Sequence, residues 1–236
     1  MKIRLEELRA VIRDIIKHDI SVNSICYGNP AAEYMSAIIT DDDPIKRWFI
    51  VSGLMDEICL SAPKNDSDTT RRDLDALVEL VGNASEEDVA FAGFVENEDN
   101  IMKLFMRVLS EAGVNASAEE YYRVDNQTLP LLHYLKHKIN RPRPHQLAHH
   151  FGLPVLPLVR TDAQTASYPS GHALVSFVMS EYYSRKHPRL APVLMELGEK
   201  IAKSRENVGI HYPSDTEVSR LISKILFKYG LFGNIV

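Results

Sequence analysis

The chain has 236 residues, 45% of them hydrophobic and 25% charged, which is the composition of an ordinary globular protein. Its formal net charge of -5 gives no signal for binding a polyanion, so nucleic acid is not an expected partner. The two cysteines, Cys26 and Cys59, lie far apart, which argues against a disulfide framework or a zinc cluster. We expect one domain spanning residues 1–236.

The N-terminal segment carries charges every few residues, where a signal peptide would have an uninterrupted apolar core. Apolar runs such as residues 48–55 and 173–179 fall far short of the roughly 20 residues that a membrane span requires. We therefore expect a soluble, cytoplasmic protein without a transmembrane helix.

Residues 2–20 place apolar side chains three and four apart with charges between them, a pattern that predicts an amphipathic helix. We expect this helix to pack on its own domain. The alternatives are a contact between two copies in a homo-oligomer or a helix lying on a membrane surface, and the acidic residues of its polar face argue against the membrane.

Further helical patterns fill the first 120 residues, and nowhere do β-branched residues alternate convincingly. Asp43 and Pro44 have the residue types of a helix cap and a first helical position. The expected helices cover residues 45–60, 69–82 and 85–112, the last with a possible break at Gly93. The chain is therefore predicted to be all-α, with no assigned role for residues 1–120.

The second half of the chain continues the helical pattern but is interrupted by proline-rich segments. Residues 145–168 show no periodicity, and because such long loops are often functional we expect this one to form a wall of a substrate pocket. The helix that starts at Gly171 is apolar on nearly every face and should be the central one. The expected helices cover residues 128–139, 171–186, 189–208 and the segment from Ser214, taken as a cap, to about 229.

Ser170, Gly171 and His172 stand at the start of this central helix. A helix N-terminus offers unpaired N–H groups, and a glycine lets an anion approach closely, so the segment could cradle an oxyanion with a hydroxyl beside it. The alternative is that Ser170 only caps the helix. The tripeptide alone favours neither interpretation.

His211 and Asp215 indicate the chemistry more specifically. A carboxylate that binds one imidazole nitrogen fixes the tautomer and makes the other nitrogen a better nucleophile or base. Arg205 continues the apolar stripe of its helix, where a guanidinium is costly unless it meets a bound phosphate or a buried carboxylate. Lys136, Arg143 and Arg205 are the cations that could neutralise a phosphoryl group during transfer.

A metal site is the alternative that the histidines offer. His133 and His137 are four residues apart, a spacing that can chelate zinc, but Tyr134 stands where a zincin has its glutamate. We expect neither a metal ion nor another cofactor.

Three blocks with fixed internal spacing are present: Lys136 with Arg143-Pro144, Pro169-Ser170-Gly171-His172, and Arg205 with His211 and Asp215. In this order they resemble the signature of the type 2 phosphatidic acid phosphatase superfamily, which includes class A nonspecific acid phosphatases and vanadium haloperoxidases. The resemblance covers residues 128–230 and implies the helical bundle fold of that superfamily and a phosphohistidine mechanism. It implies His211 as nucleophile, Asp215 as its orienter, His172 as the acid for the leaving group, and Lys136, Arg143, Ser170, Gly171 and Arg205 as the phosphate ligands.

Ser167 and Tyr168 before Pro169, with the soluble character of the chain, are more similar to the class A acid phosphatases than to the membrane lipid phosphatases. The predicted function is therefore metal-independent hydrolysis of small phosphate monoesters, a nucleotide among the candidates. A vanadate-dependent haloperoxidase is the first alternative, and the chain is short for one. A phosphate-binding protein without turnover is the second, and it would need neither His172 nor His211.

Arg141 and Arg143 lie two residues apart in an Arg-Pro repeat. Counting back seven residues from Arg143 reaches Lys136, whereas the same count from Arg141 reaches Tyr134, so Arg143 is the predicted phosphate ligand. Residues two apart in an extended segment tend to face the same side, so we expect Arg141 near the pocket mouth with a weak role in binding.

Overall fold

The computed structural model describes residues 22–28, 43–160 and 165–232. These residues form helices joined by turns and loops, with no strand among them, as predicted for an all-α chain. The predicted helix over residues 2–20 lies outside the described residues. The elements are η1 (Val22–Ser24), α3 (Pro44–Val51), α4 (Leu54–Leu60), α5 (Asp68–Gly82), α6 (Glu86–Val95), α7 (Glu98–Glu111), α8 (Ala118–Ile139), α9 (Pro144–Ala148), η2 (His149–Phe151), α10 (Gly171–Lys186), η3 (Pro188–Leu190), α11 (Ala191–Asn207) and α12 (Pro213–Lys228).

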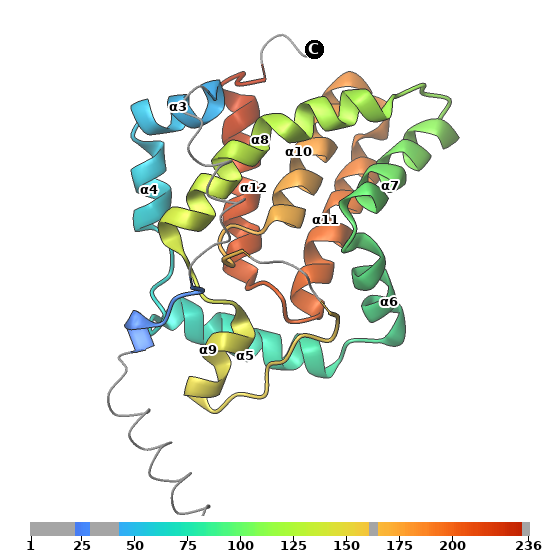
Figure 1. The fold of residues 1–236 in the computed structure, drawn as a ribbon. Helices are drawn as coiled ribbons and strands as arrows, with labels where there is room; N and C mark the ends of the chain where they lie inside the picture. The colour runs from blue at the N-terminus through green and yellow to red at the C-terminus, as the bar shows by residue number, and fades with distance from the viewer. Residues whose placement is uncertain (1–21, 29–42, 161–164, 233–236) are drawn as a thin grey trace, which may run out of the picture.

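Helix α10 is the centre of the bundle, as its apolar sequence predicted. It packs against α8, α11 and α12, and α5 and α6 in turn pack against α11 (Figure 1). Nearly every side chain from Ala173 to Tyr183 on α10 is buried, because neighbours surround the helix. At the N-terminus of α10, Ser170 is buried, whereas Gly171 and His172 are half-buried.

The helices predicted over residues 45–60 and 85–112 are each divided into two. The helix predicted over residues 45–60 is divided into α3 and α4 at Gly53, whose φ of 76° is left-handed and cannot continue a helix. The predicted cap at Asp43 is confirmed, since its carboxylate accepts from the Lys46 N–H at 2.7 Å. The region 85–112 is divided after Val95 and not at Gly93, because the Asn97 side chain caps a new helix.

Three predictions for the second half also differ from the structure. Helix α8 begins at Ala118, ten residues before the predicted start, because Ser117 caps it, and Pro130 lies inside the helix. The predicted loop over residues 145–168 contains α9 and η2, and α9 starts at Pro144. Helix α12 starts at Pro213, so Ser214 is a helical residue and not the cap.

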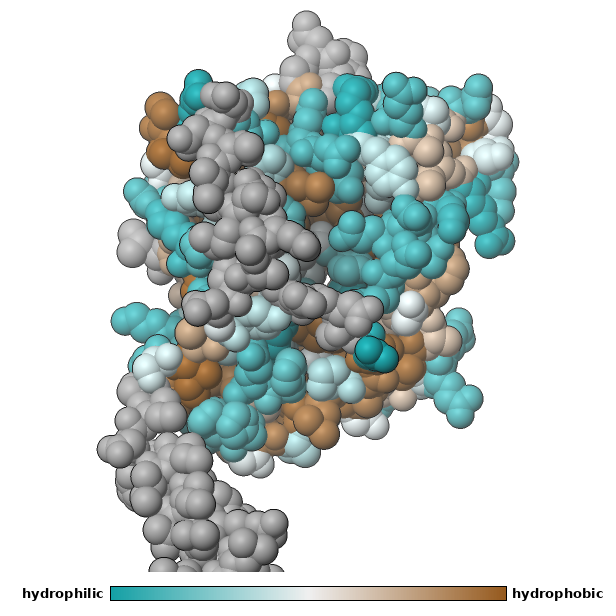
Figure 2. Space-filling model, viewed as in Figure 1, coloured by the Kyte–Doolittle hydropathy of each residue, from teal (hydrophilic) through white to brown (hydrophobic). Residues whose placement is uncertain are grey.

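No helix in the described part of the chain combines the length and the apolar character needed to cross a membrane. The face seen in Figure 2 is mixed, with hydrophilic side chains over much of it and hydrophobic ones scattered between them.

Candidate active site

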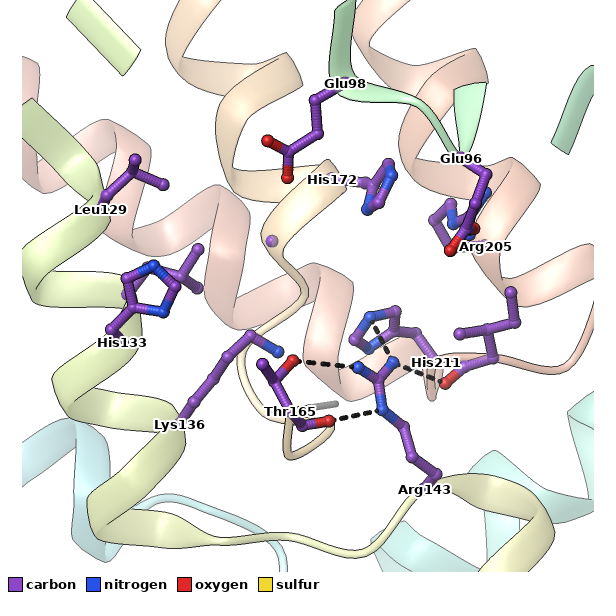
Figure 3. Close-up of a pocket in the computed structure, with 13 residues that line it drawn as sticks. Glu96, Glu98, Leu129, His133, Lys136, Arg143, Thr165, His172, Arg205 and His211 are labelled. Carbon is purple, nitrogen blue, oxygen red and sulfur yellow. Dashed lines mark hydrogen bonds and ion pairs between the residues drawn. The ribbon is translucent and has the colours of Figure 1, made fainter. Parts of the chain in front are cut away.

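A cavity of about 260 Å³ lies at the N-terminus of α10, between α8, the end of α11 and the connection from α6 to α7 (Figure 3). Six of the eight predicted site residues line it: Lys136, Arg143, Gly171, His172, Arg205 and His211. These residues are up to 75 positions apart in the sequence, and the packing of α8, α10 and α11 brings them together.

His211 is oriented by Asp215 across the turn that starts α12. The Nδ1 atom of His211 lies 3.0 Å from Oδ2 of Asp215, and the same oxygen accepts from the Tyr212 N–H at 3.1 Å and from Ser167 Oγ at 2.5 Å. Burial alone would raise the pKa of Asp215, but Arg141 and the hydrogen bonds from His211 and Ser167 hold it well below its usual range. Asp215 is therefore a carboxylate that accepts a hydrogen bond from Nδ1–H of His211.

The other nitrogen of His211 faces the cavity. Its Nε2 atom lies 2.8 Å from Nη1 of Arg143, and because a guanidinium only donates, Nε2 must be the acceptor (Figure 3). Burial, followed by the charge of Arg143, lowers the pKa of His211 well below its usual value. His211 is thus a neutral imidazole with its lone pair on Nε2.

Arg143 is held by backbone oxygens as well as by the imidazole. Its Nε donates to the Thr165 carbonyl at 3.0 Å and its Nη1 to the Ile210 carbonyl at 3.2 Å. Lys136 lies beside it and donates to the Ala166 carbonyl at 2.6 Å. Burial, followed by the neighbouring Arg143, lowers the pKa of Lys136 well below its usual value. Two buried cations with neutral partners therefore stand beside His211.

Arg205 meets a carboxylate, which is one of the two partners that its position on a core face predicted. It is 1% exposed, pairs with Glu96 and donates to the Ala92 carbonyl at 2.8 Å. Glu96 lies between α6 and α7 and lines the same cavity. No periodic pattern marks this residue in the sequence, so its contact with Arg205 was missed.

His172 adds a second imidazole to the cavity. Its Nε2 atom is buried and has no hydrogen-bond partner among the described residues. Burial lowers the pKa of His172 to about 3, with Arg205 and Arg143 adding to the effect. An anion between these cations would reverse the effect of their charges and favour the protonated form.

Ser170 and Gly171 differ in their placement. The Ser170 hydroxyl accepts from the Ala173 N–H at 3.4 Å as the N-cap of α10, and Ser170 is not among the residues that line the cavity. Gly171 does line it, and a Cβ atom there would come within 3.3 Å of Leu132. The structure thus supports the capping interpretation of Ser170 and the close approach expected at Gly171.

The predicted position of Arg141 near the pocket mouth is wrong. Arg141 is 3% exposed, does not line this cavity, and donates to Oδ1 of Asp215 at 2.7 Å. The error lies in treating an Arg-Pro repeat as a β-strand. Proline favours a backbone with three residues per turn, so side chains two positions apart point in different directions.

Three further polar residues that the predicted site did not include line the cavity: Glu98, His133 and Thr165. His133 lies one helical turn before Lys136, and burial together with that cation lowers its pKa to about 4. His137, its proposed partner in a zinc pair, does not line the cavity. The described residues contain no group of three or more His, Cys, Asp or Glu side chains arranged to hold a metal ion.

Residues 127–230 match the model of the PAP2 superfamily. This segment belongs to that superfamily. The match includes every predicted site residue and supports phosphatase activity in general terms. A solved structure described as the first transmembrane PAP2 type phosphatidylglycerolphosphate phosphatase from Bacillus subtilis is similar over 81% of this chain and 98% of that chain, with 15% identity and a TM-score of 0.49. A comparison with curated proteins found no match.

Proposed function

We propose that this PAP2 protein hydrolyses small phosphate monoesters through a phosphohistidine on His211, without a metal ion. The observation that carries the proposal is the state of His211. Its Nδ1 atom is bound to Asp215, and its Nε2 lone pair faces a cavity lined by three cationic side chains, Lys136, Arg143 and Arg205. A neutral imidazole oriented in this way is a suitable nucleophile for phosphorus.

In the proposed complex, the phosphoryl oxygens lie among Lys136, Arg143 and Arg205. The N–H of Gly171, at the N-terminus of α10, is a further donor. Positive charge from side chains then takes the place that a metal ion has in other phosphoryl-transfer enzymes. Glu96 pairs with Arg205 in the structure. When a phosphate ester binds, its phosphate group therefore takes the place of the Glu96 carboxylate beside this guanidinium.

The first chemical step forms a bond from Nε2 of His211 to phosphorus and breaks the bond to the ester oxygen. Arg143 moves its hydrogen bond from Nε2 to a phosphoryl oxygen, and Asp215 stabilises the charge that develops on the imidazole. His172, protonated beside the bound anion, gives its proton to the leaving oxygen. In the second step water attacks phosphorus, the bond between phosphorus and Nε2 of His211 breaks, and His172 takes a proton from the attacking water. Inorganic phosphate then leaves and His211 is again a neutral imidazole.

The test is a turnover assay on a panel of phosphate monoesters in the presence and absence of a chelator. We expect hydrolysis at an unchanged rate in the chelator, and inhibition by vanadate, which mimics the pentacoordinate phosphorus. Loss of activity in the chelator, restored by zinc or magnesium, would contradict the proposal. His133 and His137 would then be the candidate metal ligands.

A further inference from the structure

Behind Asp215, on the side away from the cavity, lies a buried polar cluster formed by Arg141, Asp73, Thr70 and Ser214. Arg141 donates from Nη1 to Oδ1 of Asp215 at 2.7 Å and to Ser214 Oγ at 2.8 Å. Its other arm, Nη2, donates to Thr70 Oγ1 at 3.2 Å and to Oδ2 of Asp73 at 3.3 Å. The two arms of one guanidinium therefore connect α12 with α5.

The two oxygens of Asp215 have different partners. Oδ2 accepts from His211, Ser167 and the Tyr212 N–H, whereas the partner of Oδ1 is Arg141. Rotation of this carboxylate would break the contact with Arg141 and the contact with His211 together. The position of Arg141 therefore limits the positions that the His211 ring can take.

The guanidinium is itself held on two sides. It stacks on the Tyr212 ring, with Cζ at 3.8 Å from the ring centroid, and Asp73 binds it at one end. Ser214 also donates to Asp73, so the carboxylate of Asp73 is fixed as well. Arg141 and Asp73 are 3% and 7% exposed, so solvent does little to screen these charges.

We propose that Arg141, held by Asp73 and Thr70 of α5, is a positioning residue that fixes Asp215 and, through it, the reactive nitrogen of His211. The inference rests on the proposed function of His211. Helix α5 lies outside the region 127–230 that the superfamily model matches. On this proposal α5 nevertheless has a role in turnover. The positioning role also replaces the expected role of Arg141 in substrate binding.

The first test is kinetic and uses Asp73→Asn, which removes the charge with little change of shape. We expect kcat to fall about tenfold to a hundredfold, the scale for losing a residue that orients a catalytic group, and KM to change less than about threefold. Asp75→Asn, on an exposed position of the same helix, is the matched control and should leave both constants unchanged. A rise in KM at constant kcat would show that the cluster serves substrate binding and would overturn the proposal.

The second test does not depend on turnover and uses Arg141→Gln. The charged groups around His211 are Asp215 on α12, Arg143 before α9, Lys136 on α8, and, behind Asp215, Arg141 and Asp73. In the wild-type protein, the charge of Arg141 offsets part of the negative charge of Asp215. Arg141→Gln removes this offset, so His211 experiences more of the carboxylate charge. The pKa of His211, measured by NMR of its ring nitrogens, should therefore rise by about one unit.

Several outcomes separate the two proposals. If wild-type protein hydrolyses no phosphate ester, the proposed function fails, and the NMR titration still tests the positioning role. If Asp73→Asn and Arg141→Gln lower the melting temperature but leave kcat per folded molecule and the pKa of His211 unchanged, the cluster only stabilises the fold. That result would overturn the inference, as would an equal loss of kcat in Asp75→Asn.

Discussion

At the residue scale, the cavity holds cations that differ in what they bind. Arg143 contacts Nε2 of His211 and two backbone carbonyls, whereas Arg205 is paired with Glu96. Lys136 binds the Ala166 carbonyl. Arg143 is thus the cation in direct contact with the proposed nucleophile, and the one whose loss should affect turnover most directly.

We predict that Arg143→Ala lowers kcat by about tenfold to a thousandfold, the range for removing one charged group that stabilises a transition state. Arg107→Ala, at an exposed position of α7, is the control and should have wild-type constants. Steady-state kinetics on one monoester measures both. A wild-type kcat in Arg143→Ala would show that Arg143 does not stabilise the transition state.

The histidines give a pH prediction. In the folded protein the pKa of His211 is lowered and that of His172 is about 3, against about 6.5 for a histidine in a peptide. Both rings should therefore remain neutral as the pH falls through 6.5 and take up protons only at lower pH. Added inorganic phosphate should raise the pKa of His172, because the anion offsets the charges of Arg205 and Arg143.

NMR titration of the labelled imidazoles checks this prediction directly. The expected result is a midpoint below 6.5 for both rings in the free protein, and an upward shift for His172 when phosphate is added. A midpoint at or above 6.5 for His211 in the free protein would contradict a neutral nucleophile held beside Arg143.

Much of the candidate site could be predicted from local spacing, and some of it could not. Lys136 and Arg143, or His211 and Asp215, are close in the chain, so one helix or turn sets their relation. Arg141 was misplaced because the Arg-Pro repeat was treated as a strand, and its contact with Asp73, 68 residues away, has no local signal in the sequence that could have corrected the error. The contact of Glu96 with Arg205 spans 109 residues and was missed for the same reason.

At the element scale, the sequence predicted which segments are helical better than where each one begins and ends. Helix α5 and helix α10 were placed within about one residue, because a cap or a glycine marks their ends. The start of α8 was placed ten residues too late because Thr128-Leu129-Pro130 was taken as the start of the helix. Helix α8 can keep such a proline, since its packing against α3, α4, α7 and α10 outweighs the lost hydrogen bond.

The contact between α10 and α11 depends on Gly198. Ser176 on α10 donates to the Gly198 carbonyl at 3.1 Å, and a Cβ atom at Gly198 would come within 2.3 Å of Ser180 Oγ and 3.1 Å of the Ser176 carbonyl. A side chain there would push apart the two helices that carry His172 and Arg205. Glycine is thus needed for close packing at this position.

We predict that Gly198→Ala lowers the free energy of unfolding by about 1–3 kcal/mol, the usual effect of overpacking. Gly93→Ala is the matched control, because Gly93 is also inside a helix but has nothing within 4 Å of the added Cβ. It should raise the free energy of unfolding by about 0.5–1 kcal/mol. Urea unfolding of both variants gives the comparison, and equal effects would contradict the packing argument.

At the scale of the whole molecule, the first half of the chain takes part in the site. No role was predicted for residues 1–120, yet α5 supplies Thr70 and Asp73 to Arg141. Ala92 on α6 and Glu96 after it contact Arg205. The segment matched by the PAP2 model therefore carries the proposed reacting groups, while helices before it hold two of its arginines in place.

The central claim is that His211 carries the phosphoryl group during turnover. Trapping measures this most directly: the enzyme is mixed with a ³²P-labelled monoester, quenched under alkaline conditions and digested, and the labelled peptide is sequenced by mass spectrometry. We expect an acid-labile phosphate on His211 that is absent from His211→Ala. In Asp215→Asn the intermediate should form more slowly, by a factor of roughly 10² to 10⁴. Phosphate on another residue, or turnover that persists in His211→Ala, would contradict it.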